Sequence, residues 1–124
     1  MVTVKRRVLI IANTGGDENY CESVKYDRLN YINFFKSPEG GYWRNDEIIA
    51  PDVNTCTPEL LEEIIDRENE GKDVFYWLVV FVGHGWQSDD KMTYLELYPK
   101  SPVDRDLPIS WLEQKLIRSR CLLI

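Results

Sequence analysis

The sequence lacks several features that would point quickly to a function. It has one histidine, His84, and its three cysteines, Cys21, Cys56 and Cys121, lie far apart and form no CxxC pair. An odd number of widely spaced cysteines favours neither a disulfide framework nor a zinc site, and it suits a reducing, cytoplasmic setting. No apolar run approaches the length of about 20 residues that a membrane-spanning helix needs. We therefore expect no metal centre, no membrane association and a cytoplasmic protein.

Phosphate-binding motifs and excess positive charge are absent as well. Gly15 and Gly16 follow an apolar run, but the GxGxxG and GxxxxGK[ST] spacings do not occur, so a plain strand-to-helix loop is favoured there. The formal net charge of the 124 residues is −6, which argues against nonspecific nucleic-acid binding. The apolar run 8–12 is shorter than a signal-peptide core of about 7–15 residues. No cofactor and no nucleic-acid partner are therefore expected.

The longest apolar run is Val74–Val82, which holds nine residues and is rich in β-branched and aromatic side chains. Such residues favour a strand. The run does not alternate polar with apolar residues, so both faces of this strand should be buried. That pattern is typical of a central strand in a parallel sheet covered by helices on both sides. The run leads directly into Gly83, His84 and Gly85.

The rest of the chain alternates between strand and helix patterns. Further strands are predicted over 7–12, 46–50 and 121–124, and helices over 22–36, from Pro58 to just before Gly71, and from Ser110 to about Arg118. A polar loop is predicted over 86–92, a small hairpin arm over 93–98 and an irregular segment over 99–108. We expect Trp43 in the core, and sheet-facing stripes at Leu29, Ile32 and Phe35, at Leu60, Leu61, Ile64 and Ile65, and at Ile109, Leu112 and Leu116.

Two helix starts carry capping signals. Thr57 before Pro58 and Glu59 combines a capping hydroxyl, proline at the first helical position and an acid in the first turn. Ser110 and Glu113 have the spacing of a capping box.

This order of elements predicts an α/β fold, a three-layer sandwich around a mostly parallel sheet with right-handed crossovers. The last residues, Cys121–Ile124, resemble the beginning of a further core strand without a polar terminator. A domain rarely ends in this way. We therefore expect residues 1–124 to form the N-terminal portion of a single domain whose C-terminal half is missing.

His84 is the candidate catalytic residue. Ligands and chemistry in parallel sheets collect at the carboxyl ends of the strands, and an imidazole with an unperturbed pKa of about 6.5 can act as general acid or base. Gly85 can offer a backbone N–H to a developing oxyanion. The nucleophile would belong at the carboxyl end of the adjacent strand. An ordinary surface or capping histidine remains the alternative on these grounds alone.

Cys121 is a poor candidate for that nucleophile. It lies at the beginning of its predicted strand, whereas His84 follows the end of the parallel neighbour. At about 3.3 Å per residue the strand separates the two by more than 10 Å, and a nucleophile and its base must lie within about 3 Å. Cys121 is better interpreted as a buried core residue.

Several segments together resemble the first half of a caspase-type cysteine peptidase domain, in its bacterial caspase-like, metacaspase-related branch. The resemblance covers nearly the whole chain. The segment Val80-Phe81-Val82-Gly83-His84-Gly85 is the most specific part of it, although Val82 stands where the family usually has a small residue. The other segments are Arg7–Asn13, Gly40–Trp43 before Glu47–Ile49, Thr57–Leu61, Tyr94–Leu97 and Ile109–Leu116.

The resemblance implies that His84 is the catalytic histidine and that Gly85 supplies an oxyanion N–H. It places the nucleophilic cysteine in an Asp-x-Cys pattern beyond Ile124, together with much of the substrate pocket. The chain alone is then expected to be inactive until it pairs with the C-terminal half of the same domain, and its substrate is a protein or peptide. The segment Asn13–Gly16 lacks the arginine that caspases use for aspartate substrates, so strict aspartate specificity is not supported. The alternative is a noncatalytic, caspase-like interaction module that pairs through its terminal strand.

Overall fold

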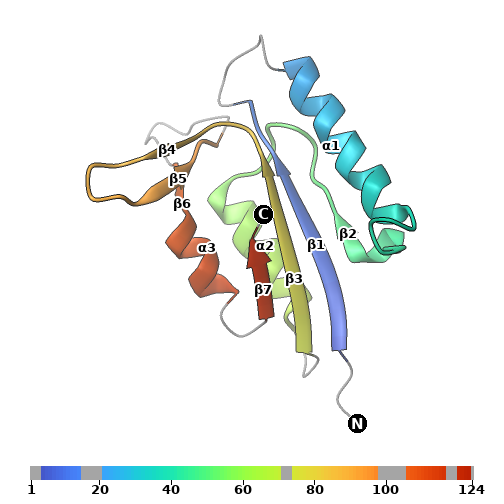
Figure 1. Cartoon of the computed structure of the whole chain (residues 1–124). Coiled ribbons are helices and arrows are strands. Elements are labelled where there is room, and N and C mark those ends of the chain that lie inside the picture. Colours follow the sequence, from blue (N-terminus) through green and yellow to red (C-terminus); the bar gives the residue numbers. More distant parts are fainter. Residues whose placement is uncertain (1–3, 15–20, 71–73, 98–105, 117–119, 124) are drawn as a thin grey trace.

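A four-stranded sheet forms the centre of the protein in this computed structural model (Figure 1). The structure describes residues 4–14, 21–70, 74–97, 106–116 and 120–123. The sheet has the order β2-β1-β3-β7, and each neighbouring pair is parallel. Its strands are β1 (Val4–Ala12), β2 (Ile48–Ile49), β3 (Val74–Val82) and β7 (Arg120–Leu123).

The central position of β3 confirms the prediction from its apolar run. It pairs with β1 along its full length, from Val4 opposite Val74 to Ala12 opposite Val82, and with β7 on its other side. Its consecutive side chains Trp77, Leu78, Val79 and Val80 are all buried. Because neighbours in a strand point to opposite faces, burial of a continuous run requires cover on both sides of the sheet.

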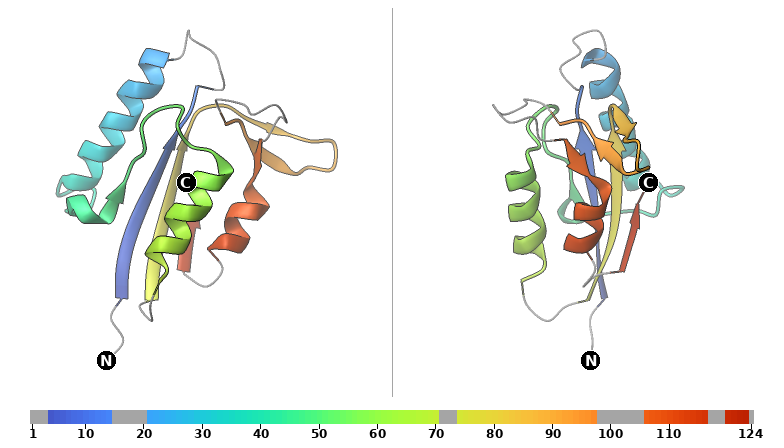
Figure 2. Two further views of the ribbon diagram at one scale, coloured as in Figure 1. Left: turned by 180° about the vertical axis from the view of Figure 1, so that it is seen from behind. Right: turned by 90° about the vertical axis from the view of Figure 1, so that its left-hand side faces the viewer.

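Helices supply that cover and make three layers (Figure 2). On one face α1 (Cys21–Lys36) packs Phe35 against β1 and β3. On the other face lie α2 (Pro58–Glu68) and α3 (Ile109–Lys115). The core under α2 and α3 joins side chains of the sheet to those of the helices: Leu9, Ile11, Trp77 and Val79 with Leu61, Ile64, Ile65, Leu112 and Leu116. The predicted α/β class and layered arrangement are confirmed at this level.

The start of α2 follows the predicted capping pattern. The Thr57 hydroxyl accepts a hydrogen bond from the Leu60 N–H at 3.1 Å, and Pro58 occupies the first turn, where its missing N–H costs nothing. The helix ends at Glu68 with Asn69 as its C-cap. Gly71, the expected terminator, lies outside the described residues.

The apolar stripe of α1 was predicted incorrectly at one position. Phe35 is buried and Ile32 packs against the core, but Leu29 is 52% exposed. Val24, which was not predicted to be buried, faces inward instead. Residues 24, 28, 32 and 35 follow the spacing of three and four that defines one helix face, and Leu29 lies about 100° around the helix from Arg28.

The predicted capping box at Ser110 is wrong. The helix α3 begins one residue earlier, at Ile109, with Pro108 as N-cap and no side-chain cap. Leu107 and Pro108 form the short strand β6, so the chain passes directly from a strand into the helix. The helix ends at Lys115 rather than near Arg118, and residues 117–119 lie outside the described part of the chain.

The strand predicted over 46–50 is shorter than expected. Asn45–Glu47 form a 3₁₀ turn, η2, and only Ile48–Ile49 pair with β1 as β2. The carboxylate of Glu47 accepts a hydrogen bond from the Arg44 N–H at 2.8 Å and so closes this turn. Because Glu47 belongs to this turn, it does not pair with β1, and β2 begins only at Ile48.

The arm after His84 is a three-stranded antiparallel sheet of order β4-β5-β6, larger than the predicted hairpin. Residues 86 and 87 were predicted to begin a polar loop. They instead belong to β4 (Gly85–Gln87), which pairs with β5 (Thr93–Leu95). The segment 99–108 was predicted to be irregular, but its last two residues form β6 (Leu107–Pro108), which adds to β5. Residues 98–105 lie outside the described part of the chain. The Trp86 and Tyr94 rings stack across the arm at 4.4 Å between centroids.

Among the residues that the structure describes, no helix combines the length and apolar character needed to cross a bilayer.

Candidate functional site

The carboxyl ends of β1 and β3 lie side by side and form the candidate site. Ala12 pairs with Val82 at the end of the two strands, and the Asn13 N–H donates to the Val82 carbonyl at 2.8 Å. The sheet order β2-β1-β3-β7 places the reversal of winding between β1 and β3. In open parallel sheets the crevice outside the strand ends at such a switch point is where ligands bind.

Gly83 brings the two strand ends into close approach. A Cβ atom built on Gly83 would lie 2.3 Å from the Asn13 carbonyl oxygen and 3.0 Å from the Phe81 ring. Since a backbone carbonyl cannot move aside as a flexible side chain can, only glycine fits at this position without a shift of the chain. Gly83 therefore sets how closely the residue that follows it, His84, lies to β1.

We expect Gly83→Ala to destabilise the protein by about 2 kcal/mol, because overpacking against a fixed group costs roughly 1–3 kcal/mol. Gly85→Ala is the comparison variant and should cost less, since a Cβ there would lie 3.1 Å from the Tyr94 carbonyl oxygen rather than 2.3 Å from that of Asn13. Urea unfolding of both variants measures the difference. Equal stability of the two variants would contradict the close approach at Gly83.

His84 is partly buried, and its backbone is hydrogen-bonded to the arm, the small sheet β4-β5-β6. Its carbonyl accepts a hydrogen bond from the Glu96 N–H at 2.9 Å, just past the end of β5. Gly85, which follows, is exposed and begins β4 opposite Leu95. The structure thus places both predicted site residues at the carboxyl edge of the sheet. The catalytic role of His84 and the oxyanion role of Gly85 remain predictions.

Thr14 and Asn54 form a polar pair at the same edge, and sequence reasoning missed it. The Asn54 Oδ1 accepts from the Thr14 N–H at 2.8 Å, and the Asn54 Nδ2 donates to the Thr14 hydroxyl at 3.0 Å. Asn54 has a φ of 65°, a left-handed conformation that asparagine adopts more readily than most residues. The segment Pro51–Asn54 signalled a turn, but nothing in it indicated a partner forty positions away.

Neither Cys56 nor Cys121 is placed to supply a reactive thiol to this site. Burial raises the pKa of the Cys56 thiol to about 11, and the opposing charge of Arg28 does not offset it, so the thiol stays protonated and unreactive at neutral pH. Cys21 is partly exposed at the first position of α1.

Cys121 lies in β7 opposite Trp77, as the strand polarity predicted. The last residue of β3, Val82, is five positions further along, about 16 Å at 3.3 Å per residue. The register thus separates Cys121 from the edge that carries His84. No group of three or more histidine, cysteine or acidic side chains able to hold a metal occurs among the described residues.

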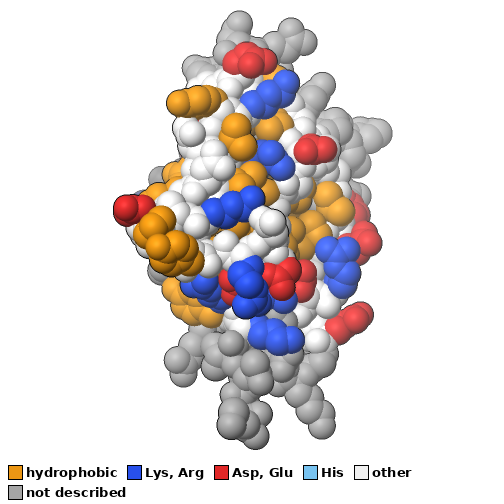
Figure 3. Space-filling model, turned by 90° about the vertical axis from the view of Figure 1, so that its right-hand side faces the viewer, with side chains coloured by type: hydrophobic (Ala, Val, Ile, Leu, Met, Phe, Trp, Pro, Cys, Tyr) orange, Lys and Arg blue, Asp and Glu red, His pale blue; other side chains and the backbone are white. Residues whose placement is uncertain are grey.

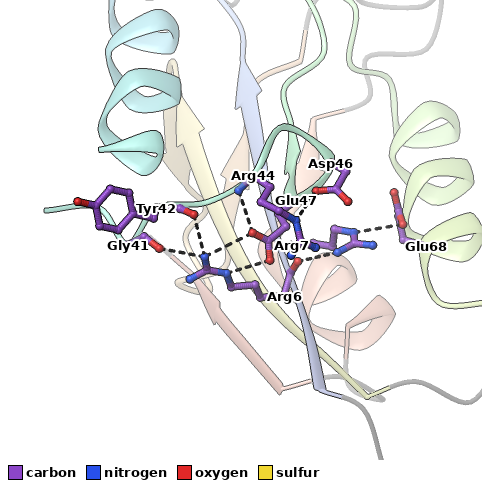
Figure 4. Close-up of polar contacts among 8 residues, drawn as sticks. All are labelled: Arg6, Arg7, Gly41, Tyr42, Arg44, Asp46, Glu47 and Glu68. Atoms are coloured by element: carbon purple, nitrogen blue, oxygen red, sulfur yellow. Dashed lines mark hydrogen bonds and ion pairs between the residues drawn. The ribbon is translucent and has the colours of Figure 1, made fainter. Parts of the chain in front are cut away.

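The opposite, amino edge of the sheet carries a network of ion pairs (Figure 4). Arg6, Arg7 and Arg44 line a cavity of about 670 Å³ together with Lys5, Asp46, Glu47 and Tyr76. Each arginine has a carboxylate partner, and the three partners are Glu47, Glu68 and Asp46 respectively. The Arg6–Glu47 pair joins β1 to the turn before β2, and the Arg7–Glu68 pair joins β1 to the end of α2.

The side of the molecule that carries α1 and β2 also shows basic and acidic side chains gathered among hydrophobic ones (Figure 3). On α1, the side chains of Tyr26, Leu29, Tyr31 and Phe34 are exposed. Charges of both signs are mixed there, so this side does not define a site for a strongly charged ligand.

Comparison with protein-family models and with curated proteins found no match to this chain.

Proposed function

We propose that this chain is the N-terminal portion of a caspase-like cysteine endopeptidase domain, with His84 as its acid–base residue. The observation that carries the proposal is the position of His84. It is the only histidine of the sequence, and it follows the central buried strand at the switch point of a parallel sheet. The resemblance of the segment Val80–Gly85 to the histidine segment of that family supports the same role.

The proposed chemistry is acyl transfer through a thiolate. His84 takes the proton of a cysteine thiol as the sulfur attacks the peptide carbonyl, and the Gly85 N–H binds the oxyanion that forms. His84 then gives the proton to the leaving amine, and water, activated by the same imidazole, hydrolyses the thioester. The intermediate exposure of His84 and the exposure of Gly85 are compatible with these roles.

We propose that the nucleophile comes from a further part of the domain. Burial raises the Cys56 pKa, and Cys121 is at the wrong end of β7. The carboxyl end of β7 lies on the same edge of the sheet as His84, because the strands are parallel. A cysteine at the end of a continued β7, supplied by the C-terminal half of the domain, would meet the requirement.

A noncatalytic caspase-like module is the second candidate. The specific observation in its favour is that β7 is the edge strand of the described sheet, and edge strands present unpaired N–H and C=O groups to partners. In this alternative the strand would pair with another polypeptide and His84 would have no catalytic task.

The native coding sequence after Ile124 and an activity assay together test the proposal. We expect an Asp-x-Cys pattern within about ten residues, the length of one long strand. The chain joined to that continuation should then cleave a peptide substrate and lose activity on thiol alkylation, whereas the 124-residue chain alone should not cleave. Alkylation-sensitive turnover by the chain alone would contradict the assignment. A continuation without the cysteine would favour the noncatalytic module.

A further inference from the structure

We propose that Asn54 is a positioning residue for His84, acting through Thr14 and the close contact between Asn13 and Gly83. The proposal rests on the catalytic role proposed for His84. Asn54 lies at the same site but on a different loop, and it takes part in none of the chemical steps described above. Three steps connect the two side chains.

The first step is the attachment of Asn54 to the segment after β1. Its backbone N–H donates to the Ala12 carbonyl at 3.1 Å, and its side chain both accepts from the Thr14 N–H and donates to the Thr14 hydroxyl. An aspartate would retain the acceptor but lose the Nδ2 donor, and an alanine would lose both. Asparagine also tolerates the positive φ found there.

The second step leads from Thr14 to Gly83. Asn13 and Thr14 are buried, at 0% and 2% exposure, so their backbone has little room to adjust. The Asn13 N–H donates to the Val82 carbonyl, and its own carbonyl oxygen lies against Gly83. By holding Thr14, Asn54 therefore also fixes the position of the preceding Asn13 carbonyl, which Gly83 contacts.

The third step concerns His84 itself. Its carbonyl is bound by the Glu96 N–H of the arm, while Gly83 on its other side is pressed against Asn13. The backbone of His84 is thus held between the arm and the end of β1. Loss of the Asn54 contacts loosens the second of these, the contact between Gly83 and Asn13. The orientation of the His84 imidazole relative to the edge of the sheet then changes.

A ring displaced by about 1 Å from its reactive geometry can cost on the order of 10²-fold in rate. In a protein that carries the complete domain, we expect Asn54→Ala to lower kcat 10- to 100-fold, in line with that estimate. KM should stay within about twofold, because Asn54 touches the support of the base rather than the substrate. Thr14→Ser, which keeps the hydroxyl, should retain nearly all activity, whereas Thr14→Val should lose part of it.

A direct measurement is possible because the sequence has one histidine. The ring signals of His84 in a proton–carbon or proton–nitrogen correlation spectrum of the 124-residue chain are therefore unambiguous. We expect Asn54→Ala and Asn54→Asp to shift these signals and to speed hydrogen exchange at the Asn13 N–H. Asn45→Ala, an exposed asparagine in η2, is the matched control and should change neither.

Unchanged His84 signals in Asn54→Ala with native circular dichroism would overturn the proposal. If that variant does not fold, the comparison of Thr14→Val with Thr14→Ser decides, since each alters one or two side-chain atoms. A shift in Thr14→Val that is absent from Thr14→Ser supports the connection, and equal spectra refute it. Shifted ring signals in a complete domain that lacks peptidase activity would retain the positioning role and reject the proposed function.

Discussion

In a protein that carries the complete domain, replacing His84 by alanine is expected to abolish peptidase turnover. Without its base the thiol is not activated and the leaving amine receives no proton. Loss of such a residue costs on the order of 10⁴- to 10⁶-fold in kcat, and the oxyanion hole and substrate binding supply only what remains. The measurement is steady-state cleavage of a peptide substrate by wild-type protein and by the His84→Ala variant at equal concentration.

The folded state should be nearly unaffected by this change. His84 is partly exposed, and substitutions outside the core usually alter stability by no more than about 0.5 kcal/mol. Gln87→Ala, three positions further along on the exposed strand β4, is the control and should keep both activity and melting temperature. Activity retained in a folded His84→Ala protein would rule out the assigned acid–base role.

The parallel sheet could be predicted from the sequence because its strands carry strong local signals. The nine consecutive apolar residues Val74–Val82 fit neither an amphipathic helix nor a half-exposed strand, and β3 has these same bounds. The location of His84 at the carboxyl edge followed directly from that strand. The capping pattern of Thr57 and Pro58 is equally local, which explains why it was confirmed.

Other features could not be predicted because they depend on contacts distant in the sequence. The strand β2 stops at two residues because Glu47 is drawn into a turn and an ion pair with Arg6, which is 41 positions away. Ser110 does not cap α3 because β6 adds to the arm and starts the helix earlier. The pair of Thr14 and Asn54 joins two loops that show only ordinary turn composition. The caspase-like identity of the domain stays a prediction.

The ion pair of Arg6 and Glu47 leads to the largest expected effect on stability. Glu47 is 6% exposed, and its carboxylate binds the Arg6 Nε at 3.0 Å and the Arg44 N–H at 2.8 Å. Arg6 also donates to the Gly41 carbonyl at 2.9 Å and lies 4.3 Å over the Trp43 ring. Breaking a buried pair costs roughly 3–5 kcal/mol. Since the side chain of Arg6 is 37% exposed, we expect Glu47→Gln to cost about 3 kcal/mol, at the lower end of that range.

The adjacent acid provides the control for this prediction. Asp46 pairs with Arg44 at 3.0 Å, but both side chains are well exposed, so Asp46→Asn should change stability little or not at all. Urea unfolding of the wild type and the two variants at neutral pH measures both effects. Equal free energies of unfolding for Glu47→Gln and the wild type would show that the pair contributes nothing.

The same carboxylate gives the wild-type protein a distinctive response to acid. Burial alone would raise the pKa of Glu47, but the hydrogen bonds from Arg6 and the Arg44 N–H, with the charge of Arg6, hold that pKa below its ordinary value of 4.5. A lowered folded-state pKa stabilises the protein fully above the unfolded-state value, and this stabilisation disappears as the pH falls through the folded-state value. The free energy of unfolding of the wild type should therefore decline below about pH 4.5, more steeply than that of Glu47→Gln. Parallel pH profiles for the two proteins would show that Glu47 is not the group responsible.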